Sequence, residues 1–268
     1  MNKISKIGSY IFLTFASIIS VFPFLWMIIG ATNASVDVTK GKLTFGQDFV
    51  SNIQRLFETT DIEIAIVNSL SIALLTTIIA ILVSSAAGYG FVIYKSRVKE
   101  KIFSILLLSM MIPFAAIMIP LYKMFGQFGL LNTYMAVVLP SVATAFLIFF
   151  FRQNTQLFPK ELLEAARMDG LGEWGMFVRV YMPTMKSTYA AAAIITFMSS
   201  WNNYLWPLVT MQTKDKATLP IIISNLNSSY TPDYGMIMVA IVIATIPTAL
   251  IFFVMQKHFV EGMLGSVK

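Results

Sequence analysis

Few side chains in this sequence could perform acid–base or metal chemistry. There is one histidine, His258, beside Lys257, and there is no cysteine, which excludes disulfides, thiolate metal sites and a lipid-modified cysteine. Catalysis or metal binding inside an apolar segment needs His, Asp, Glu or Cys. The long apolar segments contain none of these residues, so we expect no enzyme active site and no metal, and we interpret His258 as an interfacial residue.

The sequence also lacks a nucleotide-binding phosphate loop of the form G-x-x-x-x-G-K-[ST]. The single Gly-Lys pair, Gly41-Lys42, is followed by Leu43 and has no upstream glycine at the required spacing. We therefore expect no cofactor in this chain. Any ATP hydrolysis that serves it must take place on a separate protein.

Uncharged polar side chains are the remaining candidates for ligand contacts within the apolar segments. Asn68, Asn202, Asn203 and Tyr204 combine amides with an aromatic ring, a set that suits a hydroxyl-rich ligand. The alternative is structural, because buried asparagines in membrane helices also hydrogen-bond neighbouring helices.

The composition indicates an all-α integral membrane protein. Hydrophobic residues make up 57% of the chain, charged residues 12%, and the mean hydropathy is +0.76; ordinary soluble domains are about 25% charged. Six charge-free stretches can each supply the roughly 20 residues that cross a bilayer. We expect one transmembrane domain over residues 1–268 with spans at 7–30, 66–94, 102–122, 134–151, 188–209 and 236–255.

The first span has an alternative interpretation as a secretory signal. Lys3 and Lys6 precede its apolar run, and Ala31 to Ala34 offer small residues for cleavage. Its apolar run is longer than the roughly 7–15 residues of a signal peptide. This length favours a retained helix.

The basic residues predict the orientation of the spans. Six crossings place both termini on one side, and that side collects most of the 19 basic residues. The positive-inside rule then makes both termini cytoplasmic. The net charge of +6 is therefore assigned to topology, and no nucleic acid partner is expected. Inner loops fall at 95–101 and 152–187, and outer loops at 31–65, 123–133 and 210–235.

Prolines and small residues interrupt several spans. Such breaks are tolerated where neighbouring helices or a water-filled path satisfy the freed backbone groups. For each break, ordinary helix-end and packing chemistry is the simpler interpretation. The cluster from Ala86 to Gly90 and the run from Ala190 to Ala193 are places where helices are expected to approach closely.

The 152–187 loop is long enough to fold and meet a partner. Proline at 159 and glutamates in the first turn predict a short helix from Pro159 to about Asp169, ended by Gly170 in a left-handed conformation. The apolar residues Trp174, Phe177, Val178 and Tyr181 then recur at helical spacing. They predict an amphipathic segment lying against the membrane, and Pro183 is expected to break the chain before the fifth span.

This loop resembles the signature loop of binding-protein-dependent ABC permeases. The matching residues are Glu164, Ala165, Ala166, Gly170, Val180, Met182 and Pro183, with Val180 and Met182 replacing the usual Ile and Leu. Other segments are similar to the carbohydrate class, in the smaller permease of maltose-type systems: Asn68-Ser69, Ile119 to Tyr122, Asp169, Trp201 to Asn203, Pro207-Leu208, Phe259 to Gly262 and Lys268.

The resemblance implies a coupling helix between spans four and five that sits in a cleft of an ATPase subunit. Glu164 and Asp169 would make polar contacts, Ala165 and Ala166 would permit close approach, and Gly170 would shape the turn. The implied partners are a second permease, an ATPase dimer that holds ATP and Mg²⁺, and an extracytoplasmic solute-binding protein facing the 210–235 loop. Residues after Lys257 would provide a second docking site on the ATPases.

The resemblance also implies import of sugars or oligosaccharides, and a location in the inner or plasma membrane of a bacterial cell. An ABC permease for a glycerol phosphodiester or a polyol is the alternative within transport, since the loop motif alone does not separate these solutes. A non-transporting membrane scaffold is the alternative from another class.

Overall fold

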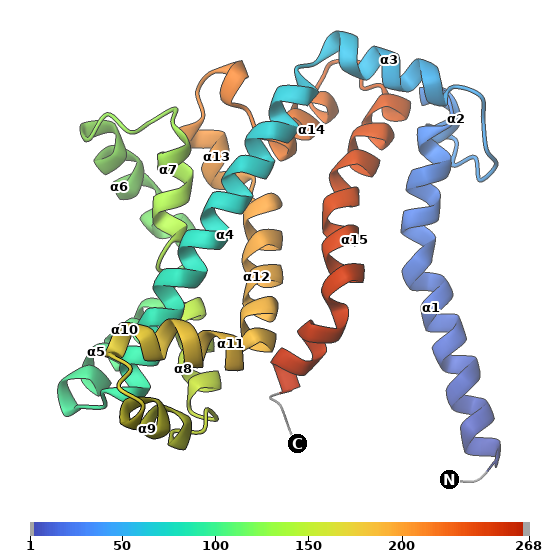
Figure 1. Ribbon diagram of the computed structural model, residues 1–268. Helices are drawn as coiled ribbons and strands as arrows, with labels where there is room; N and C mark the ends of the chain where they lie inside the picture. Colours follow the sequence, from blue (N-terminus) through green and yellow to red (C-terminus); the bar gives the residue numbers. More distant parts are fainter. Residues whose placement is uncertain (1–2, 265–268) are drawn as a thin grey trace. The chain divides into compact units, whose positions relative to one another are not determined.

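The computed structural model describes residues 3–264 and contains only helices within that range (Figure 1). The all-α prediction is therefore confirmed. The elements are α1 (Lys3–Ala31), α2 (Ser35–Thr39), α3 (Phe49–Thr59), α4 (Ile62–Ile93), α5 (Arg97–Ser109), α6 (Phe114–Gln127), α7 (Tyr134–Val138), η1 (Leu139–Ser141), α8 (Ala145–Thr155), α9 (Glu161–Met168), α10 (Glu173–Met176), η2 (Phe177–Tyr181), α11 (Met182–Thr184), α12 (Lys186–Trp201), α13 (Leu205–Thr210), η3 (Lys214–Lys216), α14 (Leu219–Asn227) and α15 (Tyr234–Leu264).

The chain divides into two compact units. The first contains the residues up to Glu63 together with Leu219–Pro247, and the second contains Ile64–Thr218 with the residues from Thr248 on. The single domain expected over residues 1–268 stays a prediction.

In the part of the chain that the structure describes, three helices are long and apolar enough to cross a membrane: α1, α4 and α15. Two bent helix pairs, α5 with α6 and the α7–η1 segment with α8, bring the number to five if each pair forms one span. The fifth predicted span corresponds to α12, which has 16 residues, followed by α13. The predicted count of six crossings therefore stays a prediction, while the apolar character of the helices fits the bilayer.

In the first unit, a buried asparagine connects α3 to the chain segment at the end of α1. The Asn52 side-chain amide donates to the carbonyls of Ala31 at 2.9 Å and Asn33 at 3.0 Å. Arg55 pairs with Asp233 at 2.8 Å, which joins α3 to the start of α15. The most apolar stretch of α1 has no buried residue, so its side chains need lipid or another protein as solvent.

The segment predicted as one span at 102–122 is two helices bent by 101°. The break follows from Pro113, which lacks an amide hydrogen and disfavours helical geometry in the residue before it. Pro113 adopts an extended conformation as the N-cap of α6. Pro120, by contrast, lies inside α6, so the two prolines of this span have different consequences.

Two further breaks interrupt predicted spans in the second unit. The α7–η1 segment and α8 are bent by 42°, and Thr144 caps the new helix by accepting from the Leu147 amide at 3.4 Å. The other break follows α12, where Asn202 is the C-cap and Tyr204 precedes α13. Helix breaks in hydrocarbon require polar partners for the freed backbone groups.

Close approach between α4 and α8 depends on Gly88. A Cβ added at Gly88 would lie 2.7 Å from the Cβ of Phe151 and 2.9 Å from the backbone nitrogen of Arg152. Ala192 of α12 packs in the same cluster as Phe151, with Ala80. These contacts confirm that the two small-residue clusters mark places of close helix packing.

We predict that Gly88→Ala destabilises the protein by about 1–3 kcal/mol, because the added methyl group overlaps α8. Gly90→Ala is the matched control: it lies in the same helix, and no described atom comes within 4 Å of the added Cβ. Thermal unfolding of the detergent-solubilised protein measures both. An unfolding midpoint for Gly88→Ala equal to that of Gly90→Ala would contradict this packing.

Candidate functional site: a packed surface helix and a polar cavity

The predicted short helix in the 152–187 loop is α9, and its ends follow the sequence signals. Glu161 and Glu164 lie in its first turn and Arg167 in its last, where their charges complement the helix dipole. Gly170 has a φ of +83°. Its amide donates to the Arg167 carbonyl at 3.1 Å, and the Leu171 amide donates to an α9 carbonyl at 3.0 Å, which is a Schellman C-cap. The left-handed prediction for Gly170 is confirmed.

The two faces of α9 differ sharply. Leu163 and Ala166 are buried in an apolar cluster of the chain itself, whereas Glu164 and Ala165 are exposed. Met168, at the end of the helix, is 89% exposed. The two adjacent alanines therefore face opposite ways: Ala166 permits close packing inside the chain, and Ala165 is the one that leaves space for an external surface.

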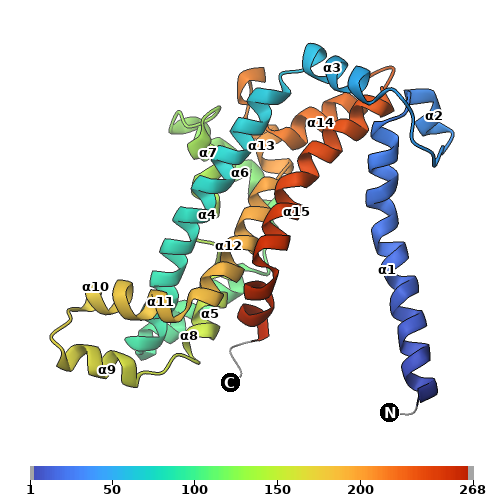
Figure 2. The same ribbon diagram turned by 45° about the vertical axis from the view of Figure 1, so that its right-hand side comes forward.

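An aromatic cluster holds α9 against the end of α4. Tyr181 is completely buried, with ring-centroid distances of 4.8 Å to Tyr89, 5.4 Å to Phe158 and 5.5 Å to Phe177. Its hydroxyl shares a 2.6 Å hydrogen bond with the hydroxyl of Thr155. Burial raises the pKa of Tyr181 above its ordinary value, so the ring stays neutral in this apolar setting. Both ribbon views show α9 and α10 beside the C-terminal end of α4 (Figures 1 and 2).

The segment predicted to lie against the membrane splits its apolar residues between two environments. Phe177 and Tyr181 are buried, but Trp174 is 75% exposed and Val178 38% exposed. Residues Phe177–Tyr181 form a π-helical turn. The rings of Phe177 and Tyr181 stack on each other, and both contact the ring of Tyr89. Aromatic packing within the chain therefore takes half of the predicted apolar side, and the expected position of this segment against the membrane stays a prediction.

Polar contacts add orientation to this packing. Glu173 accepts hydrogen bonds from the Tyr94 hydroxyl and, at 2.9 Å, from the Arg167 guanidinium, so it connects α9, α10 and the residue that follows α4. Arg167 and Glu173 are both more than half exposed, and such pairs contribute little stability. Arg152 is more buried; it pairs with Glu100 at 2.8 Å and thereby joins α8 to α5.

Asn68 lines neither of the two cavities described below. Its side-chain amide donates to the carbonyls of Asp215 at 2.9 Å and Ala217 at 2.8 Å, and its oxygen accepts from the Tyr134 hydroxyl at 2.5 Å. The residue is 3% exposed. Asn68 thus ties α4 and α7 to the chain segment before α14, as the structural alternative predicted for buried asparagines.

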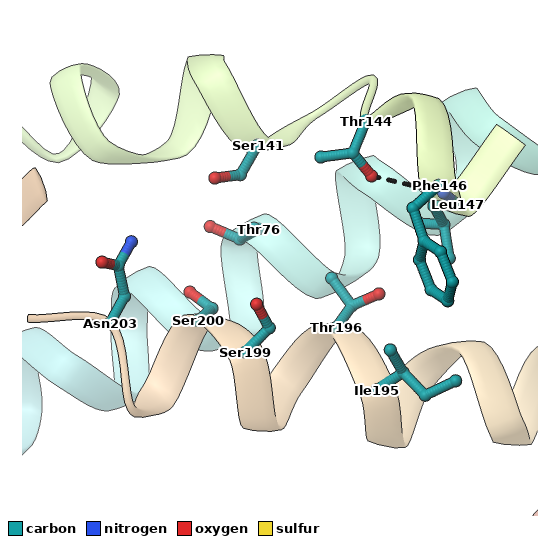
Figure 3. Close-up of a pocket in the computed structure, with 10 residues that line it drawn as sticks. All are labelled: Thr76, Ser141, Thr144, Phe146, Leu147, Ile195, Thr196, Ser199, Ser200 and Asn203. Atoms are coloured by element: carbon teal, nitrogen blue, oxygen red, sulfur yellow. Dashed lines mark hydrogen bonds between the residues drawn. The ribbon is translucent and has the colours of Figure 1, made fainter. Parts of the chain in front are cut away.

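The other three candidates line an open polar cavity system in the second unit. Asn203 lines a cavity of about 100 Å³, and an adjoining cavity of about 390 Å³ is also lined by Asn202 and Tyr204. Figure 3 shows the smaller cavity. Its polar lining comes from Thr76, Ser141, Thr144, Thr196, Ser199, Ser200 and Asn203. Among the side chains that the structure describes, no three of the types His, Asp and Glu gather where a metal ion could bind.

Residues 80–265 match the family described as the binding-protein-dependent transport system inner membrane component. The chain belongs to this family. It is therefore a multi-pass membrane permease subunit of an ABC transport system, and it is a transport subunit rather than an enzyme.

Relatives of this permease align over nearly their whole length. It is 49% identical to the lactose transport system permease protein LacG of Rhizobium radiobacter, with 100% of this chain and 98% of the relative covered. It is 34% identical to the arabinooligosaccharides transport system permease protein AraQ of Bacillus subtilis, covering 99% and 97%. Identity to the sn-glycerol-3-phosphate transport system permease protein UgpE of Yersinia pestis is 29%, covering 97% and 96%.

The fold of the permease matches two solved transporters. A bacterial ABC transporter involved in the import of the acidic polysaccharide alginate aligns with a TM-score of 0.85 at 20% identity, covering 96% of this chain and 97% of that chain. The MetNI methionine ABC transporter aligns with a TM-score of 0.57 at 16% identity, covering 72% and 92%. Both likenesses concern the fold.

Sequence reasoning missed the hydroxyl lining of the cavity. Ser and Thr are common in membrane helices and were not distinguished from helix-packing residues. The available signal was the position of Ser141 and Thr144 at one helix break and of Asn202 and Asn203 at another. Two helix breaks that lie side by side predict a polar cavity, but the sequence alone does not show that these two breaks are neighbours in the fold.

We predict that Gly170→Ala destabilises the turn after α9 by about 1–2 kcal/mol, because an alanine Cβ opposes a left-handed backbone. Gly172→Ala is the control, since Gly172 has a φ of −74° and no described atom lies within 4 Å of an added Cβ. Limited proteolysis of the 152–187 loop in the purified permease measures both. Equal cleavage rates for the two variants would contradict the strained-turn assignment.

Proposed function

We propose that this permease imports sugars or oligosaccharides and is driven through α9 by an ATPase subunit. The observation that carries the solute class is full-length identity of 49% and 34% to permeases named for lactose and arabinooligosaccharides. The uncharged, hydroxyl-lined cavity supports the same class, because hydroxyl groups match a sugar as both donors and acceptors.

The geometry of α9 supports its role as the coupling helix. Glu164, Ala165 and Asp169 lie on its exposed side or end, where an ATPase cleft can receive them. Gly170 turns the chain back toward the aromatic cluster, and Pro183 lies where α11 leads into α12. A push on the exposed face is thus transmitted to α4 through packed rings rather than through a mobile loop.

The proposed assembly contains a second permease, two ATPase subunits and an extracytoplasmic solute-binding protein. Both termini are placed in the cytoplasm, and the 210–235 loop faces the solute-binding protein. Residues after Lys257 provide a second contact with the ATPases; α15 continues to Leu264, and Lys268 lies outside the described residues. ATP and Mg²⁺ bind on the ATPase subunits, consistent with the absence of a phosphate loop in this sequence.

Coupling in this assembly is a difference in binding free energy. ATP binding favours an outward-facing arrangement only if the contacts at α9 differ in energy between two states of the permease. Alternating access follows from that bias. The alternative solute, a glycerol phosphate, is supported by the 29% identity to UgpE. It is disfavoured because none of the described side chains that line the two cavities is basic, and a phosphate would need such a partner.

Cross-linking tests the proposed docking, and the cysteine-free sequence gives a clean background. In the complete transporter, Ala165→Cys carrying a photoactivatable maleimide is expected to capture an ATPase subunit. Ala166→Cys, one residue away and 6% exposed, is expected to label poorly. Ser228→Cys is exposed on a segment assigned to the outside, so it should label without capturing an ATPase. Capture from position 228 but not from 165 would refute both the docking and the orientation.

ATP hydrolysis tests the proposed solute class. We expect the purified complete transporter with its solute-binding protein to hydrolyse ATP severalfold faster with lactose or arabinotriose than without sugar. sn-Glycerol 3-phosphate is the comparison solute and is expected to give no stimulation. Stimulation by sn-glycerol 3-phosphate alone would replace the sugar assignment with the alternative.

A further inference from the structure

The smaller cavity lies where two interrupted helices face α4. Ser141 and Thr144 flank the break before α8, while Ser199, Ser200 and Asn203 lie at the end of α12. In membrane transporters, non-helical backbone is tolerated where it lines a cavity, and solute sites commonly form at discontinuous helices. The position of the cavity therefore suits a point on the solute path.

Thr76 supplies the strongest single sign of a missing ligand. It lies in the middle of α4, is 1% exposed, and its hydroxyl has no hydrogen-bond partner among the described residues. The next residue, Thr77, satisfies its own hydroxyl by donating to the Ala73 carbonyl at 2.6 Å. An unpaired buried hydroxyl costs about 1–3 kcal/mol. A polar group from outside the chain would remove that cost.

The lining of the cavity is polar at one end and apolar at the other. Figure 3 shows the polar ends of Thr76, Ser141, Ser200 and Asn203 turned toward a common space, with Phe146 and Ile195 at the opposite end. None of the described side chains that line this cavity is charged. Such a lining fits a ring that carries hydroxyl groups on one edge and C–H groups on its faces.

The adjoining cavity extends the lining with aromatic surface. Phe114 and Trp206 line it and meet edge to face, with ring centroids 5.7 Å apart. The indole N–H of Trp206 is already donated to the Ala136 carbonyl at 2.8 Å, and the side chain is 1% exposed, so Trp206 supports the wall while Phe114, 40% exposed, supplies the aromatic surface. Ser141 and Asn203 line both cavities, which connects them.

We propose that this cavity is a sugar subsite of the permease, in which one neutral, hydroxyl-rich ring is held during translocation. In this subsite, the Thr76 hydroxyl bonds a sugar hydroxyl, and Ser199 and Asn203 bond hydroxyls from the α12 side. The inference rests on the proposed function and adds that this chain, and not the second permease alone, contacts the solute.

The uncharged lining suits weak, reversible binding of a sugar. Each hydrogen bond between uncharged groups contributes only about 0.5–1.5 kcal/mol net. A few such bonds compensate the sugar for part of its lost hydration, and they still allow release. A phosphate ester would instead need a guanidinium or ammonium partner.

The test uses the complete transporter in proteoliposomes with its solute-binding protein and radiolabelled lactose. Thr76→Val keeps the shape of the side chain and removes only the unpartnered hydroxyl, so folding is expected to be unimpaired. We expect the maximal uptake rate of Thr76→Val to fall about five- to tenfold, the effect of losing one hydrogen bond. Thr77→Val, whose hydroxyl bonds its own helix, is the control and is expected to retain at least half of the wild-type rate.

A second measurement uses Ser199→Cys in the cysteine-free chain. Lactose during turnover is expected to slow labelling of this cysteine by a methanethiosulfonate reagent at least threefold. Labelling of Ser228→Cys is expected to be unaffected by lactose. Lactose uptake by Thr76→Val at the wild-type rate, or labelling of Ser199→Cys that lactose does not slow, would overturn the subsite.

The outcomes separate this proposal from the proposed function. Sugar uptake by the wild-type transporter that Thr76→Val leaves unchanged would refute the subsite alone. Wild-type uptake of sn-glycerol 3-phosphate and of no sugar would refute the sugar assignment and the subsite together. A Ser199→Cys residue that never labels would show that the second permease fills the cavity, and this result would also overturn the proposal.

Discussion

The burial of Tyr181 among Tyr89, Phe158 and Phe177 is the interaction on which the proposed coupling depends. Helix α9 has 8 residues, fewer than the roughly 12–15 needed for even marginal stability in water. Its shape is therefore set by packing, through Leu163 and Ala166, onto this cluster. Truncating a buried aromatic ring typically costs about 3–5 kcal/mol. The helix and its connection to α4 are thus one structural unit.

The bilayer imposes the other constraint, since every polar backbone group in it needs a partner. The long helices satisfy this internally. The broken ones need neighbours: Thr144 caps α8, and the Asn68 amide donates to two carbonyls of the chain segment before α14 while its oxygen accepts from the Tyr134 hydroxyl. Where the breaks near Ser141 and Asn203 leave room, a polar cavity forms instead of further packing.

The sequence predicted the parts of the site that depend on local chemistry. The conformation of Gly170 and the limits of α9 followed from turn and capping preferences. The 101° bend at Pro113 was not predicted, because a proline can end a helix or lie within one. In this segment Pro113 precedes α6, whereas Pro120 lies inside α6. Local pattern does not distinguish the two cases.

The missed features depend on tertiary contacts. Ala165 and Ala166 are adjacent residues of the same type, so the sequence does not distinguish them. The position of the aromatic cluster shows that Ala165 faces outward and Ala166 faces inward. Phe177 and Tyr181 were assigned to the membrane because lipid and a protein core select the same residues. The unpaired hydroxyl of Thr76 is likewise invisible in the sequence, since Thr76 and Thr77 differ only in what lies beside them.

The central claim is that α9 moves as a rigid part of the end of α4 when the ATPases close. Electron–electron distance measurements between spin labels at Lys95→Cys and Met168→Cys, in the complete transporter in lipid, test it directly. Both residues are exposed, and transport activity of the labelled protein serves as the control. The account predicts the same narrow distance distribution with and without ATP. A distribution that shifts or broadens with ATP while transport continues would contradict it.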